Sequence, residues 1–177
     1  MRDDQCKEEP MTDTQSGRYL TFYMESEVYG IEICFVKEIV GIQQINTIPE
    51  CPDYVKGIIN LRGRIIPIYD MRLRLHKEPI DYDDRTCIIV VESGDAMIGL
   101  IVDSVSEVVS IDQENISEPL SFNTGWHDRF ISGIAKLEKS ITLLIDCKKL
   151  IAKDAAEEIE TPQQALECLP VLESSHI

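Results

Sequence analysis

Residues 54–70 read YVKGIINLRGRIIPIYD and residues 130–146 read FISGIAKLEKSITLLID, so one stretch is present twice in this chain. When the first residues of the two copies are aligned, one glycine, several apolar residues and the last aspartate coincide. The matched pairs are Gly57/Gly133, Ile58/Ile134, Leu61/Leu137 and Asp70/Asp146. Positions that agree in both copies are those that a common core needs. Because two copies are too few for a solenoid, they predict two related subdomains.

An upstream pair of segments extends each copy. Residues 28–40 (VYGIEICFVKEIV) match residues 97–109 (MIGLIVDSVSEVV), with Gly30 aligned to Gly99. The second copy is longer than the first, and its extra residues fall within residues 110–129. We therefore expect a first copy over about residues 18–75 and a second over about residues 85–151, joined by a charged connector.

The two copies disagree at one turn. The letters NLRG at residues 60–63 face KLEK at residues 136–139, so that Arg62 is opposite Glu138. A charge reversal within a duplicated scaffold indicates a role that belongs to one half. The alternative is that Arg62 is an ordinary exposed turn arginine.

Short β-rich runs separated by turns predict an all-β protein of two small barrels with short helical segments. A unit of about 60 residues is only marginally stable alone, because it buries a small share of its surface, so the barrels are expected to pack together and leave a seam. Residues 36–40 fit either a helical turn or a third strand. Pro67 predicts an edge strand or a bulge, because proline cannot donate to a ladder. Asp70 and Asp146 are expected to cap short helices.

The net charge of −15 is densest at the two ends of the chain. Residues 1–17 predict a disordered N-terminal arm, and residues 152–177 form an acidic C-terminal tail with a short-helix signal at Thr161. This charge repels nucleic acid and anionic lipid, and no apolar run is long enough to span a membrane. Because the N-terminus lacks a signal-peptide core, we expect a cytoplasmic protein whose six cysteines stay reduced.

Motifs that carry chemistry are missing from the sequence, including the phosphate-binding loop, the dinucleotide fingerprint and the zinc-protease motif. No cysteine belongs to a Cys-x-x-Cys or Cys/His cluster, so we do not expect a zinc site. We expect no other metal and no cofactor. Asp70, Asp103 and Asp146 each follow an apolar run, where paired carboxylates suit acid–base work but capping is the simpler interpretation. We predict that the protein is not an enzyme.

Residues 48–74 read IPECPDYVKGIINLRGRIIPIYDMRLR and combine a proline-flanked loop, the segments V-K-G and N-L-R-G, and a strand that ends in proline, aspartate and arginine. The positions concerned are Pro49, Pro52, Val55, Lys56, Gly57, Asn60, Leu61, Arg62, Gly63, Pro67, Asp70 and Arg72. This pattern resembles the CheW family of bacterial chemotaxis coupling proteins. The resemblance extends over roughly residues 18–151.

The resemblance implies a non-catalytic scaffold made of two five-stranded, SH3-like barrels packed around a shared apolar core. Members of the family couple methyl-accepting, transmembrane chemoreceptors to the histidine kinase CheA in chemotaxis signal transduction. The implied partners are the regulatory domain of that kinase and the cytoplasmic tip of a receptor. The implied location is cytoplasmic, at the inner face of the membrane through receptor arrays, without direct membrane insertion or a nucleic acid partner.

By analogy with the family, coupling to receptor or kinase is assigned to Val36, Glu38 and Arg62, and Gly57 is expected to support the nearby loop. Val105 is the counterpart of Val36 in the second copy. Both valines are expected to line the seam, where the apolar face of a receptor helix would lie, unless they belong simply to the core.

Glu38 is matched by Glu107 in the second copy, so a structural salt bridge is the competing interpretation of this residue. For contact with the kinase we nominate the loop at Ile48 and Pro49 and the hairpin at Leu61. Proline makes such a surface rigid and lowers the cost of ordering it on binding.

Two other functional classes stay open from the sequence. A small-ligand-binding β domain would use the seam between the barrels, and tight small-molecule binding without a protein partner would favour it. An enzyme would show turnover that is lost on substitution of Asp103 or His127.

Overall fold

The structure, a computed structural model, describes residues 17–118 and 130–151. Nearly all of the predicted N-terminal arm and the whole acidic tail lie outside these residues. The strands are β1 (Arg18–Met24), β2 (Glu27–Glu32), β3 (Val36–Gly41), β4 (Val55–Leu61), β5 (Arg64–Asp70), β6 (Cys87–Ser93), β7 (Ala96–Val102), β8 (Ser104–Ser110), β9 (Ile116–Ser117), β10 (Ile131–Leu137) and β11 (Ser140–Ile145). The helical segments are η2 (Ile33–Phe35), α1 (Met71–Arg74), η3 (Gln113–Asn115) and residues 147–151.

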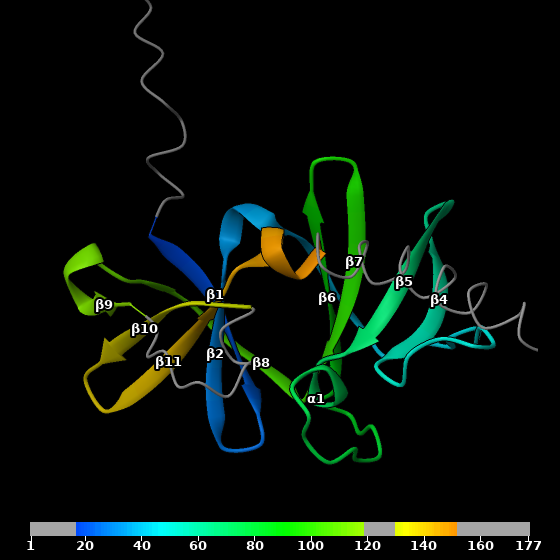
Figure 1. The fold of residues 1–177 in the computed structure, drawn as a ribbon, viewed down its shortest axis with the longest axis horizontal. Helices are drawn as coiled ribbons and strands as arrows, with labels where there is room; N and C mark the ends of the chain where they lie inside the picture. Colours follow the sequence, from blue (N-terminus) through cyan, green and yellow to red (C-terminus); the bar gives the residue numbers. More distant parts are fainter. Residues whose placement is uncertain (1–16, 119–129, 152–177) are drawn as a thin grey trace, which may run out of the picture.

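The strands form two curved sheets that lie side by side (Figure 1). Barrel A has the strand order β8-β1-β2-β11-β10-β9, and barrel B has the order β3-β6-β7-β5-β4. The predicted all-β fold of two related barrels is confirmed, and residues 36–40 belong to a strand. Barrel A has a sixth strand because the two residues of β9 pair with β10. The equivalent contact in barrel B is a single bridge between Asn46 and Ile58.

Each barrel is assembled from both copies of the repeat. The β1–β2 hairpin of the first copy lies between β8 and β11 of the second, and the β6–β7 hairpin of the second copy lies between β3 and β5 of the first. Parallel pairing joins the copies, because β2 pairs with β11 and β5 pairs with β7. The barrels therefore share one ladder order, and the two copies have exchanged their first hairpins.

The exchange makes the chain pass between the barrels at two equivalent places. β2 in barrel A leads through Ile33–Phe35 into β3 in barrel B, and we name this segment crossing one. β7 in barrel B leads through Asp103 into β8 in barrel A, and we name this residue crossing two. The alignment of the two copies places Cys34 of crossing one opposite Asp103 of crossing two.

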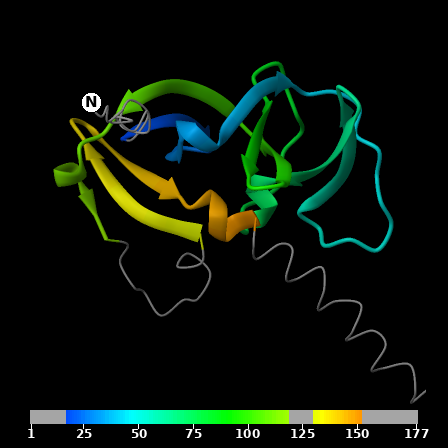
Figure 2. The same cartoon turned by 90° about the horizontal axis from the view of Figure 1, so that it is seen from above.

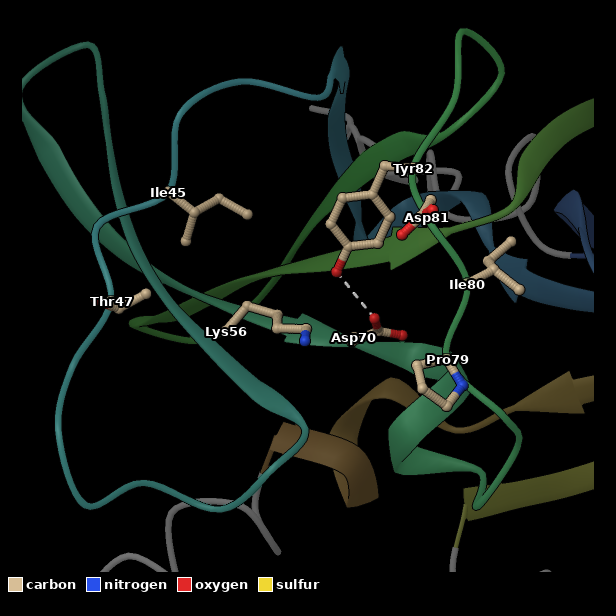
Figure 3. Close-up of a pocket in the computed structure, with 8 residues that line it drawn as sticks. All are labelled: Ile45, Thr47, Lys56, Asp70, Pro79, Ile80, Asp81 and Tyr82. Carbon is tan, nitrogen blue, oxygen red and sulfur yellow. Dashed lines mark hydrogen bonds between the residues drawn. The ribbon is translucent and has the colours of Figure 1, made fainter.

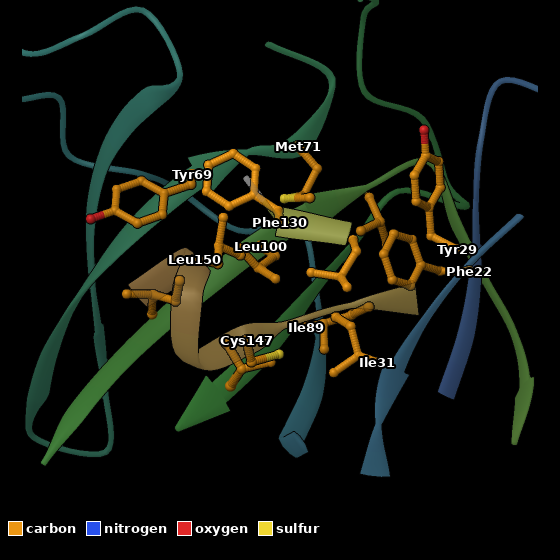
Figure 4. Close-up of a cluster of buried hydrophobic side chains, with 14 of the residues drawn as sticks. Phe22, Tyr29, Ile31, Tyr69, Met71, Ile89, Leu100, Phe130, Cys147 and Leu150 are labelled. Atoms are coloured by element: carbon orange, nitrogen blue, oxygen red, sulfur yellow. The ribbon is translucent and has the colours of Figure 1, made fainter. Parts of the chain in front are cut away.

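The central strands are buried on both faces, because one face points into their own barrel and the other points toward the neighbouring barrel. On β6, Ile88 and Val90 belong to the core of barrel B, whereas Ile89 and Val91 belong to a core shared by both barrels. The alternation follows from the period of two along a strand. Side chains drawn in the shared core in Figure 4 include Phe22, Tyr29, Ile31, Tyr69, Met71, Leu100, Phe130, Cys147 and Leu150.

The two short helices that follow β5 and β11 lie at the seam between the barrels (Figure 2). Arg74, the last residue of α1, is buried between two aromatic rings that occupy equivalent positions in the two copies. Its guanidinium carbon lies 4.3 Å from the ring centre of Tyr54 and 4.4 Å from that of Phe130. These cation–π contacts join the segment before β4 to the segment before β10, and so connect barrel B to barrel A.

Pro67 lies in a central strand, so the prediction of an edge strand or a bulge at this residue is wrong. The N–H and carbonyl groups of the opposite residue, Ile58, both bond to Asn46 on the far side of β4. Ile58 and Pro67 are therefore a non-hydrogen-bonded pair of the antiparallel ladder. On the other side of β5, pairing with β7 begins only at Ile68, opposite Gly99. Neither neighbouring strand therefore needs a backbone N–H donor at Pro67.

Candidate functional site

The turn between β4 and β5 presents Arg62 to solvent. Arg62 and Gly63 both have positive φ angles, of 53° and 87°, as expected for a two-residue type I′ hairpin turn. The Asn60 side chain closes the turn, because its Oδ1 accepts a hydrogen bond of 3.0 Å from the N–H of Gly63. The side chain of Arg62 is 80% exposed, so its guanidinium is available for further contacts.

An ion pair joins this turn to β3. Nη2 of Arg62 lies 3.2 Å from Oε2 of Glu38, whose side chain is partly buried. Glu92 at the end of β6 pairs with Lys37 on β3 at 3.5 Å and with Arg64 on β5 at 3.8 Å. This end of barrel B therefore carries five charges of both signs, which we name the charged network. Two of the residues assigned to coupling, Glu38 and Arg62, are direct partners within it.

The equivalent end of barrel A differs. Glu138 stands in the place of Arg62, and neither Glu138 nor Glu107 forms an ion pair within residues 17–118 and 130–151. Glu107 is instead held through its backbone, because the Thr21 hydroxyl donates to its carbonyl oxygen at 2.8 Å and accepts from its N–H at 3.2 Å. The salt bridge considered as the competing interpretation of Glu38 is therefore present, as its pair with Arg62, and within the described residues Glu107 has no equivalent ion pair.

Val36 and Val105 occupy equivalent positions just after crossing one and crossing two. Both side chains are half buried and pack against the shared core. Each valine therefore contributes to the packing of the seam, and part of each remains accessible. The placement agrees with both interpretations that the sequence offered, a seam contact and a core residue.

Gly57 acts through the backbone. Its φ angle is +142°, and a Cβ atom at this position would lie 2.1 Å from the carbonyl oxygen of Asn46. The next residue, Ile58, exchanges two backbone hydrogen bonds of 2.9 Å with Asn46. The absence of a side chain at Gly57 thus lets the loop of residues 42–54 lie directly against β4, which holds the loop in place.

The three residues nominated for contact with the kinase do not form one surface. Ile48 and Pro49 are exposed on the loop. Leu61 is half buried against the core of barrel B, on the same face of β4 as the fully buried Ile59. The period of two along β4 turns Leu61 inward, so the loop is the more accessible candidate.

A cleft of about 720 Å³ lies beside this loop (Figure 3). The loop and β4 form one side, with Ile45 and Lys56, and the connector after α1 forms the other, with Ile80 and Tyr82. This cleft was not predicted from the sequence, because the connector of residues 76–85 is rich in charged residues and was interpreted only as a link between the two copies. The available signal was a pair of apolar residues, Ile80 and Tyr82, set among those charges.

The hydroxyl of Tyr82 holds the connector at the cleft by donating to Oδ2 of Asp70 at 2.9 Å. Burial, together with the nearby Asp70 carboxylate, raises the pKa of Tyr82 well above its ordinary value. The hydroxyl therefore keeps its proton and stays a donor. Oδ1 of the same carboxylate caps α1, because it accepts from the N–H of Arg72 at 2.8 Å.

The capping roles of Asp70 and Asp146 are confirmed. Asp70 is the N-cap of α1, and Oδ1 of Asp146 accepts from the N–H of Lys149 at 3.1 Å in the second helix. Asp103 has a different role. Nε of Arg72 donates to its Oδ1 at 2.7 Å, and Nη2 of Arg72 pairs with its Oδ2. The N–H of Glu25 donates to the same Oδ2 at 2.8 Å.

The environment of Asp103 decides its protonation state. Burial raises the pKa of Asp103, but the hydrogen bonds from Arg72 and from the N–H of Glu25 outweigh burial and leave the pKa below its ordinary value. A carboxylate held ionised in this way has no proton to exchange near neutral pH. Burial also raises the pKa of the Cys147 thiol to about 12, so this buried sulfur is a poor nucleophile. His127, the other residue considered for catalysis, lies outside the described residues.

Within residues 17–118 and 130–151, no group of three or more His, Cys, Asp or Glu side chains is placed to hold a metal ion. The helices described there are all too short or too polar to cross a membrane.

Comparison with known proteins identifies the family. The family model of the CheW-like domain matches residues 18–155. The chemotaxis protein CheW of Klebsiella aerogenes is 34% identical over 142 residues, which cover 80% of this chain and 86% of that protein. The chemotaxis protein CheW of Treponema pallidum is 32% identical over 144 residues, which cover 79% and 85%. The crystal structure of the scaffolding protein TtCheW from Thermoanaerobacter tengcongensis has a TM-score of 0.69 at 37% identity, covering 73% of this chain and 88% of that chain.

Proposed function

The chain belongs to the CheW family of chemotaxis proteins and is a non-catalytic scaffold, and we propose that it couples a transmembrane chemoreceptor to the histidine kinase CheA. The observation that carries the proposal is the charged network, in which Arg62 is exposed and paired with Glu38 in the first half alone. A guanidinium offers five donors in a planar fork, which suits recognition of a partner's carboxylate or carbonyl groups. The packing that the two halves share does not require a positive charge at this turn, because the equivalent turn of the other half carries Glu138.

For the kinase, we propose a contact between its regulatory domain and the loop at Ile48 and Pro49 on barrel B. Both residues are exposed, and backbone hydrogen bonds from Asn46 hold the loop on β4. A surface that is rigid before binding loses less conformational freedom in the complex. The cleft beside the loop offers room for an apolar side chain of the partner between Ile45 and Ile80.

For the receptor, we propose that a helix of its cytoplasmic tip lies along the seam, against the accessible parts of Val36 and Val105. Both valines pack on the shared core, so an apolar helix face laid there would extend that core. Binding of this kind would hold the protein at the inner face of the membrane, within receptor arrays and without insertion of its own.

Substitution of Arg62 tests the proposal. Arg62→Ala should weaken coupling by about 1–3 kcal/mol, as for the loss of a charged hydrogen bond at an interface. The measurement is activation of CheA in reconstituted receptor membranes, with wild type and variant titrated over the same concentration range. The melting temperature is recorded in parallel, because the exposed side chain should contribute little to folding.

The matched control is Glu138→Ala, at the same turn of barrel A, which should leave activation unchanged. If Arg62→Ala activates the kinase as well as wild type does, or if both variants fail equally, the turn has no specific role in coupling. Wild-type protein that binds neither kinase nor receptor would contradict the proposed function itself, and tight small-molecule binding in its place would favour a ligand-binding domain.

A further inference from the structure

Arg72 brings three separate segments of the chain together at one guanidinium. Its side chain is only 9% exposed. Nε and Nη2 contact both carboxylate oxygens of Asp103 at crossing two. Nη1 contacts Oε1 of Glu25 in the β1–β2 turn at 3.3 Å and the carbonyl oxygen of Glu78 in the connector at 3.0 Å. We name this group of contacts the clasp.

The clasp links the two barrels. Arg72 belongs to α1, directly after β5 of barrel B, whereas Glu25 lies in the turn of a barrel A hairpin. Asp103 is the residue through which the chain passes from barrel B to barrel A. The N–H of Glu25 also donates to Oδ2 of Asp103, so the turn and crossing two are tied to each other as well as to Arg72.

Among the described residues, crossing one has no group of contacts equivalent to the clasp. The alignment of the two copies places Lys148, Cys34 and Gly94 at the positions of Arg72, Asp103 and Glu25. Lys148 is exposed and lies over the ring of Phe35 at 5.8 Å, and it forms no ion pair within residues 17–118 and 130–151. A cavity of about 150 Å³, bounded by Lys148 and Phe35 among others, lies at this crossing. The two crossings thus connect equivalent strands, but crossing one is a 3-10 helical segment and crossing two is a single residue, and they differ in their polar contacts.

The difference has a physical meaning. The shared core between the barrels is apolar, and apolar burial favours contact without dictating one direction. A bidentate pair between a guanidinium and a carboxylate dictates both distance and direction. A buried ion pair adds little net stability compared with apolar residues of the same size, and its best attested role is to specify one arrangement among several. The clasp is therefore better suited to fixing the position of one barrel relative to the other than to stabilising the fold.

We infer that Arg72 is a positioning residue, which together with Asp103 sets the orientation of barrel A relative to barrel B. This inference rests on the proposed coupling function for its consequence. The loop and the charged network lie on barrel B, whereas Val105 lies on barrel A. The clasp therefore sets how the surfaces on the two barrels are presented to partners that bind at the same time.

The test replaces the pair by apolar residues in the full-length protein, as Arg72→Met with Asp103→Leu. Without a buried unpaired charge, this variant should unfold at a denaturant midpoint close to that of wild type. Amide residual dipolar couplings of β6 and β10 report the relative orientation of the barrels. We expect one common alignment to fit both barrels in wild type, and a changed orientation or a second alignment to be required for the variant.

Binding to the isolated regulatory domain of CheA should stay within about twofold of wild type, while activation in receptor membranes should fall by tenfold or more. Lys148→Met, at the equivalent position of crossing one, is the matched control and should change neither measurement. Wild-type orientation and full activation in the double variant would overturn the inference. A wild-type protein that does not activate the kinase would contradict the proposed function, and the dipolar couplings would still decide the role of the clasp.

If the double variant does not fold, Asp103→Glu takes its place, because it keeps the charge and moves it by one methylene. A folded Asp103→Glu variant with a shifted barrel orientation would support the inference. The same variant with the orientation of wild type would contradict it.

Discussion

Barrels A and B have equivalent strand orders and differ in their polar side chains. In both, an aspartate at the end of a strand, Asp70 in β5 and Asp146 after β11, caps a short helix. The N–H of this aspartate donates at 2.7 Å to the carbonyl of the residue just before β4 or β10, which is Tyr54 in one barrel and Phe130 in the other. Barrel B adds the charged network at its end, and barrel A has Glu138 at the equivalent turn. We therefore attribute the residues that the two barrels share to packing of the fold. The residues that differ between the barrels are the candidates for a role specific to one of them.

The largest expected difference between equivalent residues concerns Gly57 and Gly133. Gly57→Ala should lower the free energy of unfolding by about 3 kcal/mol or more, because its Cβ would lie 2.1 Å from a backbone oxygen and its φ angle is +142°. Gly133→Ala should cost less, about 1–2 kcal/mol, because its Cβ would lie 2.8 Å from Cγ2 of Ile116 and 3.2 Å from the backbone oxygen of Ser117, farther than the 2.1 Å at Gly57. Urea unfolding of both variants measures the difference, and equal losses would show that the loop on β4 is not held in the way described.

The second difference lies at the crossings. Asp103→Asn should destabilise the protein by about 2 kcal/mol, since it removes a charge that Arg72 contacts through two nitrogens and leaves that guanidinium partly unpaired. Cys34→Ser at crossing one should have a smaller effect, because Cys34 is exposed. Urea unfolding at neutral pH provides the comparison. A larger loss for Cys34→Ser would reverse the assignment of the clasp to crossing two.

The same pair makes a prediction about pH. The pKa of Asp103 is lowered in the folded protein. Its stabilisation is therefore present above the unfolded-state pKa of about 3.9 and is lost as the pH falls through the folded-state pKa. Between pH 7 and about pH 3, the difference in unfolding free energy between wild type and Asp103→Asn should shrink. A difference that stays constant over this range would mean that the charge on Asp103 does not contribute.

The smallest expected effect is on folding at the charged network. Glu38→Gln and Arg62→Ala should each change the free energy of unfolding by no more than about 0.5 kcal/mol, because Arg62 is 80% exposed and such pairs are screened by solvent. The change should shrink further in 0.5 M salt, where screening is stronger, as expected from the ionic-strength dependence of exposed charges. Thermal unfolding at two salt concentrations checks this. A loss several times larger than that of an exposed pair would make the pair a structural element and weaken its assignment to coupling.

Some errors of the sequence interpretation came from local rules that neighbouring strands override. Pro67 signals an edge strand by its missing N–H, yet it lies in a central strand, where no donor is needed opposite Ile58. The salt bridge considered for Glu38 is present, but the sequence match with Glu107 does not carry it to the second half, because among the described residues Glu107 has no basic partner. In both cases the decisive neighbour is remote in the chain or belongs to the other copy.

The sequence by itself determined the all-β class, the duplication, the helix caps at Asp70 and Asp146, and the family. These features depend on local turn chemistry, on the period of two along strands and on a pattern of residues read in order. The exchange of the first hairpins, the clasp at Arg72 and the cleft at the connector were decided by the tertiary structure. The reason is that both copies present equivalent strand edges and apolar faces, so the local pattern permits either copy as the partner. Contacts such as that of Arg72 with Asp103, 31 residues apart, join residues of the two copies and form only when both barrels are assembled.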